Sequence, residues 1–187
     1  MEEQQAKGQR ALFLDRDGVI NEDLGYISRW EDVRFVPGIF SLCRTAQSLG
    51  YRIFIVTNQA GIGRGFYSED DFQGLMRWML EEFAQEGVTI DAVYHSPFHP
   101  VHGIGEYKRE HEDRKPGAGM LRRAKTEFGI SLAESVMVGD RCTDIAAANS
   151  AGLRQAFLIA GTETSCPGKF IPVTTLAEVE AWLLVEI

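Results

Sequence analysis

The stretch FLDRDGVIN, residues 13–21, decides how this sequence folds and where its chemistry lies. Apolar residues run directly into Asp15 and Asp17, and Gly18 follows at once. A continuous apolar run of this kind is typical of a strand that is buried on both faces of a sheet. Two like charges at the tip of such a strand repel each other unless a cation joins them. The stretch therefore predicts a buried strand that ends at a binding or catalytic site.

The size and composition of the chain indicate an ordinary globular protein. The 187 residues suit a single domain, 1–187, and 44% hydrophobic and 25% charged residues are usual values. No apolar run could span a membrane and no signal-peptide pattern opens the chain, so we expect a cytoplasmic protein. We expect the polar residues 1–9 to form a disordered tail. A net charge of −8 without a basic patch argues against general nucleic-acid binding.

The three cysteines of the sequence show no pattern that indicates a disulfide or a metal site. Cys43, Cys142 and Cys166 lie far apart and show no paired spacing. An odd number of cysteines without such spacing argues against a disulfide framework and against a thiolate metal site. We therefore expect neither.

Apolar β-rich segments alternate with amphipathic segments along the chain. Such alternation predicts an α/β fold in which a parallel sheet is covered by helices on both faces. The clearest helix begins after Ser68, where Asp71 completes a capping box, and it ends near Gly87. We expect strands over residues 11–14, 52–56, 92–94, 135–138 and 155–159, and further helices over about 39–49, 118–128 and 176–185 and after residues 143–144.

Polar residues follow the expected strands at the points where the strands end. Asp15 and Asp17 follow the first strand, Thr57 follows the second, and Asp140 follows the fourth, while Lys115 precedes a helix. Ligands of parallel sheets bind beyond the carboxyl ends of the strands, so we expect these side chains to converge. Each short pattern alone is weak, because turns and helix N-caps often contain such residues. Together, and in this order, they predict an active site.

The expected cluster contains the groups that phosphoryl transfer requires. Carboxylates at one point need a cation to join them, and oxygen ligands without imidazole or thiolate favour Mg²⁺. Asp15 is the candidate nucleophile, which would form an aspartyl-phosphate, and Asp17 is the candidate acid and base. Thr57 and Lys115 would contact the phosphoryl oxygens and stabilise charge in the transition state. The candidate metal ligands are Asp15, Asp17 and Asp140.

Four segments, FLDRDGVIN, VTNQAGIGRG, RKP and VGDRCTDIAAA, resemble the four motifs of the haloacid-dehalogenase (HAD) superfamily of phosphatases. The resemblance implies a Rossmann-like domain with strand order 5-4-1-2-3, bound Mg²⁺ and the residue roles given above. Members often carry a cap domain after the first or second motif. Here 39 residues (18–56) separate Asp17 from Thr57, and 57 residues (58–114) separate Thr57 from Lys115. Neither gap has room for a cap, so we expect an open site whose loops set specificity.

The residues around the motifs narrow the resemblance to one branch. NEDLGYISRWEDVRFVPG, TNQAGIGRGFYSEDDF and RKPG resemble heptose-bisphosphate phosphatases, and histidinol phosphatases are close relatives. The resemblance implies a monomer that removes the C7 phosphate of D-glycero-D-manno-heptose 1,7-bisphosphate, in nucleotide-activated heptose synthesis for surface polysaccharide. The alternatives are histidinol phosphate or another small phosphomonoester and, from a different class, a non-catalytic phosphosugar-binding module. The implied substrate-binding residues are Asp23, Leu24, Gly25, Tyr26, Asn58, Gln59 and Arg114.

Three charged residues near the motifs each admit two interpretations. The planar guanidinium of Arg114 suits a phosphate that does not react, and the alternative is a solvated loop residue. Arg141 either helps to hold a phosphate or covers the start of a helix. Asp144 either supports the metal site or is a charge favourable to a helix dipole, and we expect a supporting role. Residues 61–65, GIGRG, lack the ending of a P-loop, and we expect a flexible substrate loop there.

One loop departs from the family pattern. The family usually has a zinc loop, Cys-x-His followed by Cys-x-Cys just before Arg-Lys-Pro, and no cysteine stands at those positions here. A zinc site rebuilt from histidines and Asp113 is one interpretation. A loop without thiolates matches a closed structural zinc site poorly, so we expect no bound zinc. We expect hydrogen bonds and charge pairs to stabilise the loop instead, formed by Lys108, Arg109, Glu110 and Glu112. All four histidines of the chain fall in this loop: His95, His99, His102 and His111.

Overall fold

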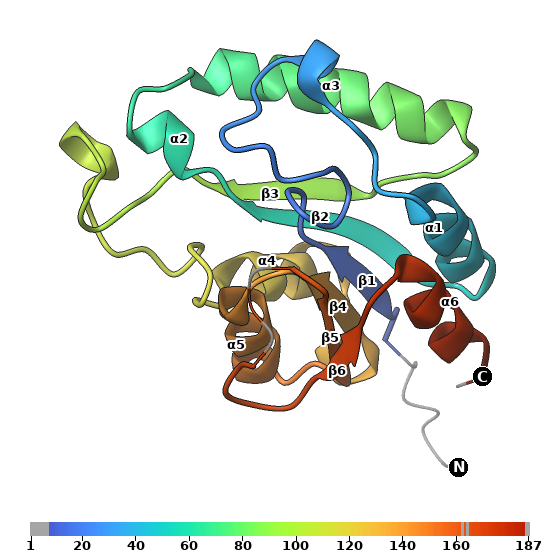
Figure 1. Cartoon of the computed structure of the whole chain (residues 1–187). Helices are drawn as coiled ribbons and strands as arrows, with labels where there is room; N and C mark the ends of the chain where they lie inside the picture. Colours follow the sequence, from blue (N-terminus) through green and yellow to red (C-terminus); the bar gives the residue numbers. More distant parts are fainter. Residues whose placement is uncertain (1–7, 162, 164, 186–187) are drawn as a thin grey trace.

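Six parallel strands form one sheet in the computed structural model, which describes residues 8–161, 163 and 165–185 (Figure 1). Their order is β3-β2-β1-β4-β5-β6, so the order implied by the family resemblance is confirmed, and β6 extends it. β6 was not expected because three residues, IPV, are too few for a periodic pattern. The strands are β1 (Ala11–Leu14), β2 (Arg52–Asn58), β3 (Ala92–Ser96), β4 (Val136–Gly139), β5 (Gln155–Ile159) and β6 (Ile171–Val173).

β1 lies inside the sheet between β2 and β4, and its residues alternate between two hydrophobic cores. Leu12 and Leu14 belong to one core, and Ala11 and Phe13 belong to the other. None of these four side chains is exposed to solvent. Because both faces of the sheet are covered, the strand is continuously apolar, as the sequence predicted.

Helices cover both faces of the sheet (Figure 1). Helices α1, α3 and α6 pack on the core that contains Leu12, and α4 and α5 pack on the core that contains Phe13. At the start of α3, the Ser68 hydroxyl accepts a hydrogen bond from the Asp71 amide and Asp71 accepts one in return, so the predicted capping box is confirmed. The helices are α1 (Ile39–Ser48), α2 (Ala60–Gly63), α3 (Glu69–Gln85), α4 (Gly119–Phe128), α5 (Cys142–Ala151) and α6 (Leu176–Val185), with short 3-10 turns at Trp30–Asp32, Gly105–Tyr107 and Leu132–Glu134.

The short helix α2 stands where a flexible loop was expected, so that expectation is wrong for residues 61–63. Ile62 is buried in a hydrophobic core. A Cβ atom at Gly63 would lie 2.2 Å from the Pro97 carbonyl oxygen. The Gly63 carbonyl also accepts a hydrogen bond from the Ile104 amide at 2.8 Å. At Gly63 the missing side chain therefore permits close packing and not movement.

The beginning of the chain is partly built into the fold. Residues 1–7 of the expected disordered tail lie outside the described residues. Gln9, however, forms a β-bridge with Ile130, and its carbonyl accepts a hydrogen bond from the Ser131 amide at 2.8 Å. The expectation of disorder is therefore wrong for Gln9. Among the helices of the described residues, none has the length and apolar character that crossing a membrane requires.

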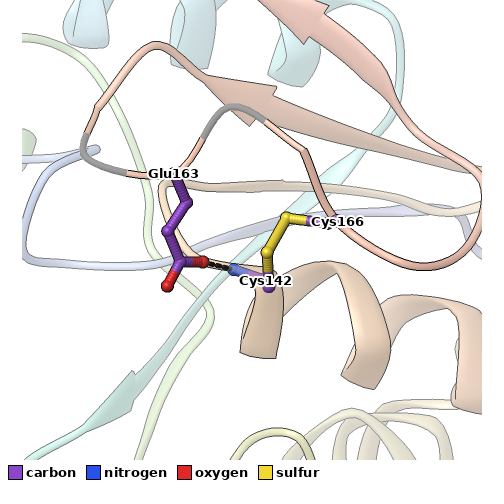
Figure 2. Close-up of side chains that lie close together, drawn as sticks. All are labelled: Cys142, Glu163 and Cys166. Atoms are coloured by element: carbon purple, nitrogen blue, oxygen red, sulfur yellow. Dashed lines mark hydrogen bonds between the residues drawn. A yellow bond between two sulfur atoms is a disulfide. The ribbon is translucent and has the colours of Figure 1, made fainter.

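Cys142 and Cys166 form a disulfide, which corrects the expectation that no cysteines pair. The two residues are 24 positions apart, but the segment after β5 returns across the start of α5 and brings their Cα atoms to 5.1 Å (Figure 2). Glu163, in the same segment, accepts a hydrogen bond from the Cys142 amide. Spacing along the chain could not reveal this pair, because the contact depends on how that segment folds back. Cys43 is buried and not disulfide-bonded.

Reduction of the Cys142–Cys166 disulfide should lower the free energy of unfolding. The bond closes a loop with a sequence separation of 24 residues, and a closed loop of this length contributes up to about 3.5 kcal/mol by restricting the unfolded chain. We expect a lower melting temperature in a phosphine reductant than without it, measured by thermal denaturation. A Cys142→Ser/Cys166→Ser variant is the control, because its melting temperature should not respond to the reductant. Equal melting temperatures for the wild type under both conditions would contradict the prediction.

Candidate active site

The polar residues that follow the strands meet in one pocket of about 490 Å³ at the carboxyl edge of the sheet. Asp15 follows β1, Thr57 lies near the end of β2, and Asp140 follows β4. The pocket lining includes each predicted catalytic residue. Of the other predicted site residues, Leu24 and the supporting residue Asp144 are not part of the described lining. The pocket is lined by Asp15, Asp17, Asp23, Gly25, Tyr26, Thr57, Asn58, Gln59, Ala60, Gly61, Tyr67, Arg114, Lys115, Asp140, Arg141, Thr143 and Glu163.

Lys115 lies at the bottom of this pocket between two carboxylates. Its Nζ is 2.9 Å from Asp15 Oδ1 and 2.6 Å from Asp144 Oδ1, and it donates a hydrogen bond to the Val56 carbonyl at 2.8 Å. The lysine side chain is 3% exposed and the Asp144 side chain is not exposed at all. Burial lowers the pKa of Lys115, but the two carboxylates outweigh it and raise that pKa above its usual range. Lys115 therefore remains a cation.

Asp15, Asp140 and Asp144 form a buried carboxylate cluster whose oxygens lie within 4.8 Å of one another. Burial, then the neighbouring carboxylate of Asp144, raises the pKa of Asp140 to about 6. Burial also raises the pKa of Asp15 to about 7, although Lys115 opposes the shift. The Oδ1 atom of Asp140 is buried and has no hydrogen-bond partner among the described residues. A buried carboxylate oxygen without a donor, beside two further carboxylates, is suited to a hard cation such as Mg²⁺.

Gly18 allows the carboxylate cluster to sit close to the β1 loop. Its φ of +85° is a backbone conformation that other residues rarely adopt, and a Cβ atom there would lie 2.4 Å from Asp140 Oδ2. The chain therefore turns at Gly18 without pushing Asp140 away. The positive φ and the close approach of Asp140 explain why a glycine follows Asp17 directly.

Asp17 is held apart from the carboxylate cluster by its own set of donors. Arg16 donates to Asp17 Oδ1 at 2.7 Å, and Asn21 donates to the same oxygen at 3.1 Å. Gln59 Nε2 donates to Asp17 Oδ2 at 3.2 Å. The Asp17 side chain is 26% exposed, so it faces the pocket rather than the core. Its carboxylate is thus separate from Asp15, as different roles for the two aspartates require.

Thr57 and Asn58 connect β2 to the rest of the pocket. The Thr57 hydroxyl accepts a hydrogen bond from Gln59 at 2.8 Å, and Tyr67 donates to Gln59 at 2.6 Å. Asn58 accepts from the Lys115 amide at 3.0 Å and donates to the Lys115 carbonyl at 2.9 Å. Asn58 therefore fixes the backbone that carries Lys115, and its side chain has a structural task beside the predicted substrate contact.

The outer part of the pocket is formed by loop residues. Arg141 forms an ion pair with Asp23 at 2.8 Å, and Arg64 donates a hydrogen bond to the Tyr26 hydroxyl. Arg114 donates to the Phe98 carbonyl at 2.9 Å, and burial is the main cause that lowers its pKa. Of the predicted substrate-binding residues, Leu24 is absent from the described lining of the pocket, and its side chain is exposed.

Four residues in or beside the pocket have contacts that the sequence did not predict. The sequence suggested a supporting role for Asp144, and the structure places it in direct contact with Lys115. Arg16, between the two motif aspartates, is 1% exposed and ion-paired to Asp17, and its place in a run of three charged residues did not indicate that it is buried. Glu163 reaches the pocket from the segment after β5, and Tyr67 reaches it beside Gln59, eight residues earlier, to which it donates a hydrogen bond; no periodic pattern reveals either position.

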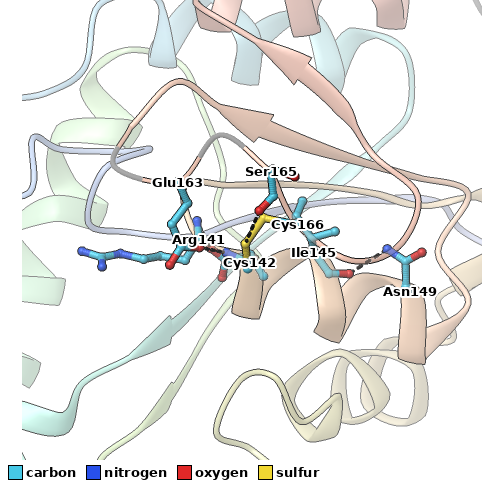
Figure 3. Close-up of a disulfide and its surroundings, with 8 residues drawn as sticks. Arg141, Cys142, Ile145, Asn149, Glu163, Ser165 and Cys166 are labelled. Atoms are coloured by element: carbon cyan, nitrogen blue, oxygen red, sulfur yellow. Dashed lines mark hydrogen bonds between the residues drawn. A yellow bond between two sulfur atoms is a disulfide. The ribbon is translucent and has the colours of Figure 1, made fainter.

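The disulfide lies directly beside this pocket. Figure 3 shows Arg141, Cys142 and Glu163 together at the start of α5. Glu163 lines the pocket and accepts a hydrogen bond from the Cys142 amide, so the loop after β5 forms part of the pocket wall. The disulfide therefore connects that wall to the helix that follows Asp140.

The four histidines do not form a metal site in the part of the chain that the structure describes. The groups there that could hold an ion are the carboxylate cluster and Cys142, Glu163 and Cys166, whose two sulfur atoms are already bonded to each other. His95 instead contacts Glu69 at 2.9 Å. His99 accepts backbone hydrogen bonds within its own turn. These contacts give each of these two histidines a local structural role.

Known proteins resemble this chain in both sequence and structure. A family model described as HAD-hydrolase-like matches residues 113–174. A D-glycero-alpha-D-manno-heptose-1,7-bisphosphate 7-phosphatase from Burkholderia mallei is 53% identical over 83% of this chain and 82% of its own length. The corresponding beta-named phosphatase from Vibrio cholerae is 46% identical over 80% of each chain.

A solved structure supports the same relationship. D,D-heptose 1,7-bisphosphate phosphatase from B. bronchiseptica, complexed with magnesium and phosphate, superposes with a TM-score of 0.82 at 27% identity and covers 95% of this chain and 99% of its own. The parallel sheet and its helices are thus the Rossmann-like fold of HAD phosphatases, and the gaps between the motif residues hold α1, α2, α3, β3 and 3-10 turns in place of an inserted cap. The chain belongs to the D-glycero-D-manno-heptose-1,7-bisphosphate 7-phosphatase family of HAD-like hydrolases.

Proposed function

We propose that this protein is a Mg²⁺-dependent phosphatase that removes the C7 phosphate of D-glycero-D-manno-heptose 1,7-bisphosphate. The observation that carries the proposal is Lys115 between Asp15 and Asp144, with Asp17 held separately two residues after Asp15. This arrangement offers a nucleophile, a fixed cation and an independent acid and base in one pocket. The names of the relatives supply the substrate.

The charge of the carboxylate cluster supports a divalent cation. Asp15, Asp140 and Asp144 bring three carboxylates together, and Lys115 is the buried ammonium that lies among them. When all three carboxylates are ionised, one ammonium offsets one of the three negative charges, which leaves two for a divalent ion. We propose that Asp15, Asp140 and the Asp17 carbonyl hold Mg²⁺. The bound ion would neutralise the phosphate and orient it for attack.

Each protein group has a defined task in the proposed reaction. Asp15 attacks the phosphorus atom, and the bond from phosphorus to the leaving oxygen breaks as the aspartyl-phosphate forms. Asp17 gives a proton to that leaving oxygen and then takes one from the water that hydrolyses the intermediate. Thr57 and Lys115 stabilise the charge on the phosphoryl oxygens. Because Lys115 is already fixed by Asp15 and Asp144, it requires little reorganisation as charge develops.

The outer pocket favours a bisphosphate over a simple phosphomonoester. Arg114 and Arg141 place two guanidinium groups on the pocket lining, and that of Arg141 lies 2.8 Å from Asp23 and 3.6 Å from Asp140. A planar guanidinium binds phosphate oxygens through parallel hydrogen bonds. Histidinol phosphate has a single phosphate, so it would offer no second phosphate for these guanidinium groups to bind. A non-catalytic binding module would have no need of the Asp17 carboxylate and its three donors.

Two further features of the proposal concern the protein as a whole. We propose that it acts as a single-domain monomer in the cytoplasm and supplies heptose 1-phosphate for activated-sugar synthesis. All of the proposed catalytic residues line one pocket of a single chain, so the proposed reaction requires no residue from a second chain. The net charge of −8 supports a small-molecule substrate over a nucleic acid.

Replacement of the nucleophile should abolish turnover. In Asp15→Asn, the amide cannot form an acyl-phosphate, so we expect kcat for phosphate release to fall about 10³-fold or more. The matched control is Asp32→Asn, because Asp32 is exposed on a 3-10 turn outside the pocket lining. Chelation with EDTA should stop release by the wild type, and added Mg²⁺ should restore it. Activity of Asp15→Asn near that of wild type would disprove the proposed mechanism.

The substrate assignment predicts a strong preference for the bisphosphate that depends on Arg114. We expect kcat/KM for heptose 1,7-bisphosphate to exceed that for histidinol phosphate by about 10²-fold, because a buried charge-assisted contact is lost with the latter. Arg114→Ala should remove most of this preference and leave hydrolysis of p-nitrophenyl phosphate nearly unchanged. Arg122→Ala, an exposed arginine on α4, is the control.

Both anomers of the bisphosphate should be included in that comparison, because alpha- and beta-named relatives match this chain at 53% and 46% identity. Faster release from one anomer would identify the preferred substrate. Faster release from histidinol phosphate than from either anomer would keep the mechanism and reject the substrate.

A further inference from the structure

The loop that carries Arg114 is organised around the ring of Phe98. The His111 ring stacks on Phe98 with a centroid distance of 4.1 Å and an interplanar angle of 15°. The Arg109 guanidinium lies over the same ring, 4.5 Å from its centroid. We call Phe98, Arg109 and His111 the Phe98 cluster. Its members come from the two ends of the loop between β3 and Lys115, so the contacts close the loop on itself.

Arg114 is tied to this cluster through the backbone. Its Nη1 donates a hydrogen bond to the Phe98 carbonyl at 2.9 Å, and its amide donates to the His111 carbonyl at 3.0 Å. Both the guanidinium and the backbone of Arg114 therefore depend on where Phe98 and His111 lie. The planar fork has further donors that can face the pocket, which Arg114 lines.

The cluster sits on the loop surface and not in the protein core. Phe98 and His111 are half-buried and Arg109 is exposed, and Phe98 is a member of neither hydrophobic core. A stacked ring pair and a cation over a ring each contribute modestly at such a site. Removing the ring should therefore loosen the loop without unfolding the sheet.

The remaining contacts of the loop anchor its far end. Asp113 forms an ion pair with Arg123 of α4 at 3.2 Å, and the Asp113 amide donates to His111 Nδ1 at 3.1 Å. The His99 amide donates to the Tyr107 carbonyl at 3.0 Å. We expected Arg109 to stabilise this loop through a charge pair. In the described residues its guanidinium instead lies over the Phe98 ring. The loop is thus a connected unit with Phe98 at its centre.

We propose that the Phe98 cluster positions Arg114 to bind the phosphate of the substrate that does not react, and that it does so without a bound metal. The inference rests on the proposed function, because the second phosphate belongs to the bisphosphate substrate. Phe98 is a positioning residue in this scheme: it acts on the substrate through Arg114 alone. A rigid arginine loses less conformational freedom on binding than a mobile one, which increases affinity.

The test compares Phe98→Ala and Phe98→Tyr with wild type on two substrates. For Phe98→Ala we expect KM for the bisphosphate to rise about tenfold, because small displacements of a positioning group are costly. We expect kcat for the bisphosphate and both constants for p-nitrophenyl phosphate to stay within about twofold of wild type. Phe98→Tyr retains the aromatic ring and should restore KM. Trp30→Ala removes an exposed aromatic residue that lies outside the pocket lining and is the matched control.

The outcomes separate this proposal from the proposed function. Wild type and Arg114→Ala with equal KM for the bisphosphate would reject the Arg114 role, and the positioning proposal with it. A raised KM in Arg114→Ala together with a normal KM in Phe98→Ala would reject the positioning role alone. If Phe98→Ala does not fold, His111→Ala removes one partner of the ring and should raise KM in the same way; an unchanged KM would overturn the proposal. Elemental analysis that finds one zinc per chain would overturn the metal-free claim.

Discussion

The buried ammonium of Lys115 between Asp15 and Asp144 is the interaction on which the rest of the site depends. Removing charges from water costs several kcal/mol for each ion, so such a group persists only when every member has partners. Lys115 meets this condition with two carboxylates and the Val56 carbonyl. Removal of the lysine would leave two buried carboxylates without compensation. The contact is therefore a requirement for folding this edge of the sheet as well as for chemistry.

The topology of the sheet explains how these charges meet. Asp15 follows β1, which pairs with both β2 and β4, so its neighbours at the carboxyl edge come from the ends of those two strands. Asp144 arrives on the first turn of α5, where its carboxylate also accepts a hydrogen bond from the Arg141 amide at 3.0 Å. The helix start and the lysine thus share one carboxylate. Because both faces of the sheet are apolar, its carboxyl edge is the place where the charged groups can gather.

The sequence predicted the features that depend on local patterns and missed those that depend on distant contacts. Five strands, the capping box at Ser68 and the convergence of the candidate catalytic residues in one pocket follow from periodicity and from polar residues at strand ends. The disulfide of Cys142 and the wall residue Glu163 depend on how the chain after β5 folds back, which spacing does not encode. Asp144 combines a local and a distant feature. The sequence predicted its place at the start of a helix, but its partner Lys115 lies 29 residues earlier in the sequence.

Because no cap domain covers the pocket, loops must determine the substrate specificity, and ordered loops do so with a smaller loss of entropy on binding. A cap domain would enclose the substrate, whereas here loop residues such as Arg114 and Arg141 line the pocket and are the proposed contacts of the phosphate that does not react. Ordering a loop upon binding costs roughly 1–2 kcal/mol per residue in backbone entropy alone. Contacts that order the loop beforehand remove this cost from the binding step. In this protein the ring of Phe98, the ion pair of Asp113 and the disulfide of Cys142 each order a different loop segment before substrate arrives.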